Sequence, residues 1–413
     1  MKRILIFVLL LLTSCSTARK AVRNVAENPY DNDNQYVIIL SMDAFRWDLA
    51  DRANTPTLDS LKRVGSYAEI YPVYPSNTFP SHYSMATGLY PDHHGVVNNG
   101  FFDKVLGRQM SVFDKEDTAT EGFWSGDPIW NTAERQGRTA NIFMWPGSEV
   151  PIGGHQATVW TVYSDEPTYR QRADWVIDAM TRPVEEIPNL VMWYFEEPDG
   201  TMHRHGPTSQ EAIAQAEHID STLRYFFWKI RQSPVFDRIN FIVTADHGMS
   251  EVSNDRIVNL YPLLDSTQVI RTVSGNPFGV EVTEEYVDTA LRQLAKIKGL
   301  KAYRRDMIPA RYNYGSHPTR LTNIIIMPET GWTIEYRSPA TLPRNISGGT
   351  HGFDCFDRDM HMVFYGSGPA FRKGFTQRPF QNQNMYIILC HLLGVKPSPN
   401  DCDWNAVGKM FVE

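Results

Sequence analysis

Three continuous apolar runs of the chain are each followed closely by an acidic residue. The runs start at Tyr36, Asn189 and Phe241, and the acids that follow them are Asp43, Asp199 and Asp246. Apolar runs of this length, separated by helical stretches, predict a mostly parallel central sheet with helices on both faces. Ligands of such sheets bind beyond the carboxyl ends of the strands, so the three carboxylates are expected to converge in space.

The spacing of apolar residues also predicts helices and a domain division. The clearest helix is expected from Ser209 to Gln232, where apolar residues recur every three or four positions. Another helix is expected from Ser125 to Gly137. Between 266 and 343 the acid and histidine motifs stop. A helical stretch from Val282 to Ile297, with strand-like segments after it, predicts a small inserted α/β subdomain there. The main domain is then expected to comprise residues 35–265 and 344–413.

A hydroxyl residue, Thr78, stands between a proline-marked extended segment and a helix expected from Ser81 to Gly88. The first turn of a helix offers free N–H groups and the positive end of the helix dipole, so a hydroxyl there is well placed to attack an anionic phosphate. Taken alone, a threonine before a helix is more often an ordinary cap.

Acids and histidines gather at the expected strand ends. Asp199 is followed by His203, Asp246 by His247, and a glycine-rich loop carries His351. Asp and His are ligands suited to zinc, and an ionised hydroxyl such as that of Thr78 can complete a coordination shell. Two metal ions close together can polarise a phosphoryl group and activate a nucleophile. Any one of these residues alone would be read as a loop cap or a surface polar group, but their number favours a metal site.

With these motifs the chain resembles the nucleotide pyrophosphatase/phosphodiesterases, the type I phosphodiesterase branch of the alkaline phosphatase superfamily. The resemblance runs from Val37 to Asn400 and implies an alkaline-phosphatase-like α/β fold. The matching motifs are Thr78-Phe79-Pro80, Thr87–Pro91, His94–Asn99, Asp127–Trp130, Trp145–Ser148, Glu197-Pro198-Asp199 and Ala245–Met249. Three positions depart from the common pattern: Ser81, Met202 and Cys355.

The resemblance implies roles for individual residues. One zinc ion would be held by Asp199, His203 and His351. The second would be held by Asp43, Asp246 and His247, with Thr78 reaching it as the nucleophile. Asn99 matches the asparagine that donates to the phosphoryl oxygen, and Phe79 matches the aromatic residue that stacks on a nucleobase. Tyr163, placed by approximate alignment, is the candidate for the opposite face of that base.

The expected activity is therefore zinc-dependent hydrolysis of phosphodiester or pyrophosphate bonds through a phosphothreonine intermediate. A lysophospholipid or choline-phosphate diesterase of the same family is the nearest alternative. A phosphomonoesterase is disfavoured because no basic residue stands beside Thr78, and a sulfatase because Thr78-Phe79-Pro80 lacks the required arginine. A catalytically silent binding lipoprotein would have lost ligands that are all present here.

The composition and charge of the chain limit the kinds of molecule that it is expected to bind. The chain has 413 residues, 42% of them hydrophobic, which is enough for a large core with an insertion. Its formal net charge of −7 argues against binding nucleic-acid duplexes through a basic surface. Small phosphodiesters are the expected substrates, with nucleotides and nucleotide sugars favoured. Bound divalent cations would make the electrostatic potential at the site positive, so an acidic protein could still bind an anionic phosphate there.

The N-terminus predicts export. Lys2 and Arg3 precede an apolar run that is too short to span a membrane and is typical of a signal peptide. The sequence up to Cys15 resembles a bacterial lipobox, so residues 1–15 are expected to be a lipoprotein signal and 16–34 a tether. Lipidation of Cys15 would anchor the chain in the cell envelope, at the outer membrane; a simple secreted protein is the alternative. Export permits disulfides, and Cys390 and Cys402 could pair. The sequence leaves the oligomeric state open.

Overall fold

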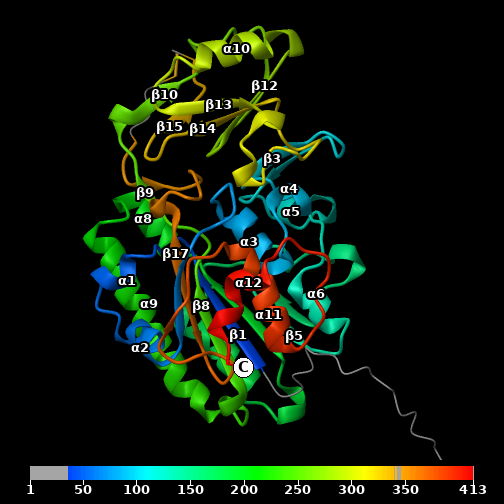
Figure 1. Cartoon of the computed structure of the whole chain (residues 1–413), viewed down its shortest axis with the longest axis vertical. Coiled ribbons are helices and arrows are strands. Elements are labelled where there is room, and N and C mark those ends of the chain that lie inside the picture. Colours follow the sequence, from blue (N-terminus) through cyan, green and yellow to red (C-terminus); the bar gives the residue numbers. More distant parts are fainter. Residues whose placement is uncertain (1–35, 339, 342–345, 413) are drawn as a thin grey trace, which may run out of the picture.

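A computed structural model describes residues 36–338, 340–341 and 346–412, and an eight-stranded sheet lies at the centre of its larger part (Figure 1). The strands of this sheet are β1 (Tyr36–Met42), β2 (Ser66–Ile70), β5 (Ala140–Phe143), β6 (Val159–Thr161), β7 (Leu190–Phe195), β8 (Ile239–Thr244), β17 (Met362–Ser367) and β18 (Phe375–Thr376). Their order is β18-β2-β17-β8-β1-β7-β5-β6. All pairings are parallel except those of β17 with β8 and β2, which confirms the expected mostly parallel sheet.

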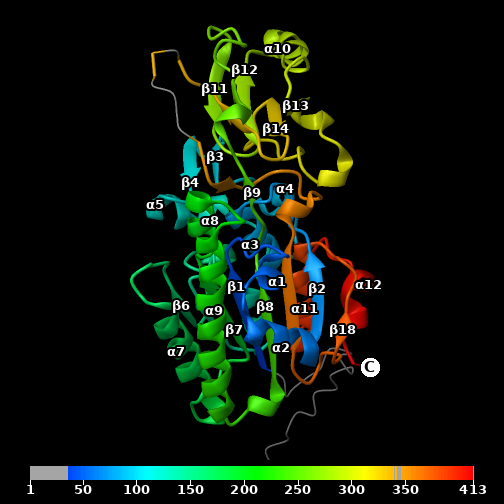
Figure 2. The same cartoon turned by 90° about the vertical axis from the view of Figure 1, so that its left-hand side faces the viewer.

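The central strand β1 is buried along its whole length because helices cover both faces of the sheet. One face is covered by α1 (Leu49–Arg52), α2 (Pro56–Val64), α7 (Tyr169–Met180) and α9 (Gln210–Lys229). The other is covered by α3 (Thr78–Thr87), α6 (Ile129–Glu134) and α11 (Met385–Leu393). Figure 2 shows α7 and α9 on one side of the sheet and α11 on the other. The expected helix from Ser209 to Gln232 is confirmed as α9 and the short 3-10 turn after it.

Short elements at the upper edge of this sheet complete the larger part of the molecule. They are the hairpin β3 (Gly100–Asp103) and β4 (Arg108–Ser111), the pair β9 (Ser250–Glu251) and β16 (Gly349–Thr350), and the helices α4 (Pro91–His94), α5 (Lys115–Thr118) and α8 (Asp199–His205). The short helix α12 (Trp404–Val407) packs beside α11, where the ring of Trp404 lies 4.7 Å from that of His391.

The helix that carries the hydroxyl motif begins three residues earlier than the sequence predicts. Helix α3 starts at Thr78 rather than Ser81, because a proline is tolerated in the first turn, where the N–H groups have no partner within the helix. Pro80 therefore lies inside that first turn. The helix ends as expected at Gly88, whose left-handed backbone (φ 70°) lets its N–H donate to Ser84.

Two other predicted helices are shorter than expected. The helix expected from Ser125 to Gly137 is only α6, because Gly126 adopts a left-handed conformation (φ 87°) and Pro128 is extended. The stretch from Val282 to Ile297 was expected to be helical throughout. Val282 instead ends a strand, and α10 (Val287–Leu294) starts after an extended Thr283 and a 3-10 turn.

A second, smaller sheet lies above the first in Figure 1. Its antiparallel strands run in the order β11 (Val269–Val273), β12 (Phe278–Val282), β14 (Ile324–Pro328), β13 (Leu300–Arg304), and α10 contacts β13. Beside it β10 (Ile257–Asn259) pairs with β15 (Thr333–Glu335). These elements share a separate apolar core that includes Val258 and Leu260, ahead of residue 266. The domain bounds at 266 and 343 stay a prediction.

The cysteine pairing suggested by the sequence is wrong. Cys390 and Cys402 are free thiols, as is Cys355. Cys390 is buried in α11, whereas the Sγ of Cys402 lies 3.2 Å from the carbonyl oxygen of Gln383.

No helix among the described residues is both long and apolar enough to cross a membrane. The signal peptide, the tether and the lipid anchor at Cys15 lie outside the described residues, so these three assignments stay predictions.

Candidate metal and nucleophile site

Three carboxylates converge at the carboxyl edge of the central strands, as the sequence predicts. Asp43 directly follows β1, Asp246 comes two residues after β8, and Asp199 begins α8 after β7. Asp43 and Asp246 are buried, with 3% and 0% of their surface exposed. The loops are tied together because the N–H of Ala44 donates to Asp246 Oδ1 at 3.0 Å.

Each of these acids keeps one carboxylate oxygen without a hydrogen-bond partner among the described residues. These are Asp43 Oδ1, Asp199 Oδ1 and Asp246 Oδ2, all of them buried. Buried polar atoms are nearly always paired, and an unpaired buried carboxylate oxygen is especially costly. Three such oxygens at one place fit a bound cation.

Three histidines surround these oxygens. The Nε2 atom of His247 lies 3.4 Å from Asp43 Oδ1 and 3.2 Å from Asp246 Oδ2. The Nε2 atoms of His203 and His351 lie 3.3 Å and 3.7 Å from Asp199 Oδ1.

The backbone fixes how these rings present their nitrogens. Each Nδ1 lies within 3.1 Å of a carbonyl oxygen, that of Gly349 for His203, Gly248 for His247 and Ser76 for His351. A carbonyl oxygen can only accept, so each Nδ1 carries the proton and each Nε2 presents a lone pair to the carboxylates. This is the tautomer that a metal-ligating imidazole needs.

The protonation equilibria reflect the crowding of these groups. Burial raises the pKa of Asp246 to about 8, and burial together with the charges of Asp246 and Asp199 raises the pKa of Asp43. Burial opposes the charge of Asp199, yet its interaction with His203, when that ring is protonated, outweighs burial and lowers the pKa of Asp199. Burial also lowers the pKa of His247 to about 3, so this ring stays neutral. A divalent cation would favour the ionised carboxylates and the neutral ring.

Two groups of residues have ligand atoms within 4.8 Å of one another: Asp43, Asp246 and His247, and Asp199, His247 and His351. The first group matches one expected ligand set. In the second, His247 takes the place expected for His203, whose ring instead lies beside Asp199 and His351. The rings of His247 and His351 stack with centroids 3.8 Å apart, so the two groups adjoin.

The expected nucleophile lies next to these groups. Thr78 is the first residue of α3, and its Oγ1 lies 3.3 Å from His247 Nε2. Thr78 is half-buried.

The amide of Asn99 has a defined orientation beside Thr78. Its Oδ1 accepts from the backbone N–H of Phe79 at 3.0 Å, which assigns the oxygen because that partner can only donate. The Nδ2 group has no partner among the described residues. It is therefore the end of the side chain that is available to donate to a ligand.

The two aromatic candidates pack against different neighbours. The ring of Phe79 lies 6.0 Å from that of Trp124, and the ring of Tyr163 lies 6.2 Å from that of Tyr194. Tyr163 is 40% exposed. Their roles on either side of a base stay predictions.

Comparison with known proteins decides the family. The family model for type I phosphodiesterase/nucleotide pyrophosphatase matches residues 37–354. The chain belongs to this family.

Curated proteins of this family are similar in sequence to this chain over most of its length. Rat ectonucleotide pyrophosphatase/phosphodiesterase family member 3 is 32% identical over 387 residues, which are 90% of this chain and 43% of the relative. The chain therefore spans less than half the length of that relative. Human family member 5 is 31% identical over 90% of this chain and 77% of its own. The bis(5'-adenosyl)-triphosphatase enpp4 of Xenopus laevis is 31% identical over 91% and 81%.

Solved structures confirm the alkaline-phosphatase-like fold. Murine family member 5 superimposes with a TM-score of 0.85 at 30% identity, covering 92% of this chain and all of the other. An inactive variant of the murine protein, with a threonine replaced by alanine and in complex with AMP, matches with the same TM-score at 29% identity.

Two residues that hold this family site in place were missed from the sequence. The hydroxyl of Tyr194, near the end of β7, donates to Asp43 Oδ2. His82 is buried in α3 between Ser41 Oγ, 2.8 Å away, and Asp246 Oδ2, 3.4 Å away. His82 stands four residues after Thr78, one helical turn along, which is the one sequence signal that could have indicated it.

The smaller sheet also reaches the site, through Asn276 in the loop between β11 and β12. Its side chain donates to the carbonyl oxygen of His351 at 2.8 Å. Its own carbonyl accepts from Asn77 Nδ2 at 2.7 Å, directly before Thr78. A Cβ on Gly352 would lie 2.4 Å from that carbonyl oxygen, so only glycine permits the approach. Asn276 thus joins the nucleophile's helix to a metal-ligand candidate.

Asn276→Ala should weaken divalent-metal binding about tenfold, because the backbone carbonyl of His351 loses its hydrogen-bond donor and the loop that carries the His351 ring is held less firmly. Metal content after dialysis against graded zinc concentrations measures the effect. The melting temperature should change little, since only one side-chain hydrogen bond is lost. Asn405→Ala, at an exposed asparagine far from the site, is the matched control; equal metal binding in both variants would contradict the role of Asn276.

Proposed function

We propose that this chain is a two-zinc phosphodiesterase that cleaves nucleotide phosphodiester or pyrophosphate bonds, with Thr78 as the nucleophile. The observation that carries the proposal is the position of Thr78 Oγ1 beside His247, next to three buried carboxylate oxygens that lack partners. Asp and His side chains with deprotonated Nε2 atoms suit zinc. Zinc bound here would supply Lewis acidity to the phosphoryl group and lower the pKa of a nearby hydroxyl or water.

The residues of the chain support a two-step displacement. In the first step Thr78 Oγ1 gives up its proton and attacks phosphorus, and the bond from phosphorus to the leaving oxygen breaks, with its electron pair and a proton going to that oxygen. In the second step a water oxygen gives up a proton and attacks the phosphothreonine, and the bond from phosphorus to Oγ1 breaks. Oγ1 takes the electron pair and a proton, and a phosphate monoester leaves. The Nδ2 group of Asn99 is the donor for the charged phosphoryl oxygens, and the positive end of the α3 dipole favours negative charge at the same place.

The names of two relatives support a nucleotide as the substrate class. One curated relative is named for bis(5'-adenosyl)-triphosphatase activity, and a solved relative holds AMP. A nucleoside on the phosphorus next to Thr78 would bring its base close to Phe79, the next residue on α3. We therefore favour nucleotide substrates over choline-phosphate esters.

Thr78→Ala should abolish hydrolysis of p-nitrophenyl thymidine monophosphate, with a loss of roughly 10³-fold or more, because the attacking atom is removed. Thr78→Ser should retain part of the rate. Ser81→Ala is the matched control on the same helix, because the Ser81 hydroxyl is buried without a hydrogen-bond partner among the described residues. Near-normal turnover by purified, zinc-loaded Thr78→Ala would refute the nucleophile.

Chelation should remove activity, and added zinc should restore it, because the carboxylates lose the cation that offsets their charge. Elemental analysis of the active protein is expected to give two zinc ions per chain. A fully active protein with one ion or none would exclude the two-zinc mechanism, whereas two ions of another metal would change only the metal.

Phe79→Ala should raise KM for a nucleotide diester by roughly 5- to 160-fold, which corresponds to the loss of about 1–3 kcal/mol of stacking. An aliphatic diester should be affected much less. The comparison uses a panel of dinucleotides, nucleotide sugars and glycerophosphocholine. Equal losses on all substrates would show that Phe79 only packs the helix start. Much faster cleavage of glycerophosphocholine would favour the choline-phosphate alternative.

A further inference from the structure

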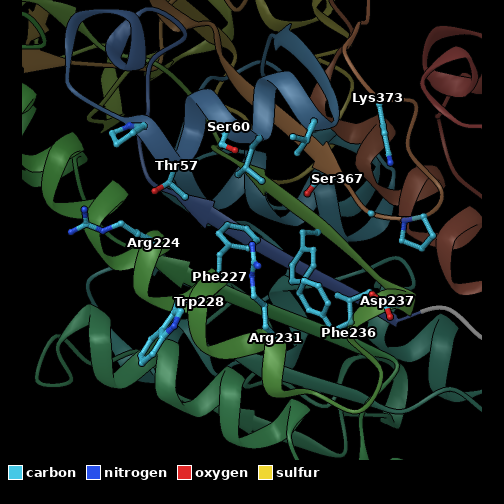
Figure 3. Close-up of a pocket in the computed structure, with 17 residues that line it drawn as sticks. Thr57, Ser60, Arg224, Phe227, Trp228, Arg231, Phe236, Asp237, Ser367 and Lys373 are labelled. Atoms are coloured by element: carbon cyan, nitrogen blue, oxygen red, sulfur yellow. The ribbon is translucent and has the colours of Figure 1, made fainter.

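A hollow of about 720 Å³ opens at the edge of the eight-stranded sheet opposite the metal and nucleophile site (Figure 3). It is lined by the amino end of β8 at Ile239 and by Ser367 at the end of the antiparallel β17. Helices α2 and α9 contribute to its lining. Its volume falls within the range of about 300–1,000 Å³ that is usual for small-molecule sites.

The lining of this hollow is mainly apolar. Phe227, Phe236, Phe241 and Leu61 contribute to it. Trp228, also part of the lining, is 62% exposed. The hydroxyl of Thr57 is already engaged with the carbonyl of Asp220 at 3.3 Å. Few polar groups remain to recognise a nucleotide base, so the lining favours a hydrocarbon chain.

Positive charge surrounds the apolar lining. Arg224, Arg231 and Lys373 line the hollow, against one carboxylate, that of Asp237. Among the described residues none of the three cations has a hydrogen-bond or ion-pair partner. Figure 3 shows Arg224 and Lys373 on opposite sides of the hollow, with Arg231 between them. This concentration of unpaired cations stands out in a chain whose formal net charge is −7.

We propose that this hollow binds a long-chain fatty carboxylate. The hydrocarbon chain would lie against the phenylalanine rings and Leu61, and the carboxylate head would meet Arg231, which lies between the other two cations. Charge complementarity selects an anionic head over a neutral one. Binding needs neither Thr78 nor the metal ligands, which lie at the other end of the strands, so the site is independent of the proposed catalysis.

Titration calorimetry with dodecanoate, below its aggregation concentration, tests the proposal on the full chain. We expect saturable binding of one dodecanoate per chain and none of butyrate, which lacks the chain. Dodecyl maltoside, with a neutral head, should bind at least about tenfold more weakly. Higher salt should weaken dodecanoate binding, because the head-group attraction is screened.

Variants locate the site. The triple substitution Arg224→Gln, Arg231→Gln and Lys373→Gln should raise the Kd for dodecanoate roughly tenfold, because the contact with Arg231 and the attraction of the two flanking cations are lost. Ser60→Trp, on the α2 side of the hollow, should block binding by filling it. Arg63→Gln removes one positive charge from α2 outside the lining; it is the control for loss of surface charge and should bind as the unaltered chain does. Thr78→Ala should also bind normally.

Three outcomes would overturn the proposal. The first is the absence of saturable binding, and the second is equal affinity for dodecanoate and dodecyl maltoside. The third is dodecanoate binding that the triple variant and Ser60→Trp leave unchanged. Association only with vesicles of anionic phospholipid, without binding of free dodecanoate, would assign the cationic hollow to a membrane surface instead and would also refute a fatty-carboxylate site.

Discussion

The repulsion among three clustered carboxylates is the constraint around which the site is organised. Asp43, Asp199 and Asp246 lie at the ends of neighbouring strands, where burial and the neighbouring charges oppose the ionisation of Asp43 and Asp246. Burying an unpaired charge costs far more than a hydrogen bond returns, so such a cluster persists only if a cation or protons offset it. The backbone N–H of Ala44 and the hydroxyl of Tyr194 satisfy the oxygens that point into the protein. The remaining oxygens face the histidines.

The same arrangement explains why the nucleophile belongs on α3. The helix starts at Thr78, and His82, one turn later, fills the space between Ser41 and Asp246. Burial lowers the pKa of His82 to about 3, so this ring adds no positive charge that would compete for the carboxylates. The helix is thus held against the acidic edge by a neutral side chain, and the positive end of its dipole lies at Thr78, where phosphate charge would develop.

The sequence predicted the parts of the molecule that follow from local pattern. Strands β1, β7 and β8 could be recognised because both their faces are apolar, and the ligand candidates follow them directly. The start of α3 was misplaced because proline suggests a helix boundary, although the first turn tolerates it. Tyr194 lies within an apolar strand, and Asn276 lies in a loop with no motif. Their roles depend on contacts with residues 151 and 75 positions away, which no local pattern encodes.

The expected pairing of Cys390 with Cys402 is a second case in which a local sequence pattern does not determine side-chain contacts. Two cysteines flanking a loop suggest a bond, yet the folded chain uses one as a small buried apolar residue in α11 and turns the other toward a backbone carbonyl. Proximity along the chain carries no information on the direction of either side chain. Export would permit a disulfide here without requiring one.

Because the smaller sheet has its own apolar core, the contact through Asn276 can be lost on heating before the larger sheet unfolds. This core is built from few buried residues, and cooperative units of a protein open with their own free energies. If the smaller sheet loosens first on heating, Asn276 leaves His351 and Asn77 while the eight-stranded sheet is still folded. Heat inactivation would then begin below the temperature of global unfolding, and cooling would reverse it as long as the larger core had held.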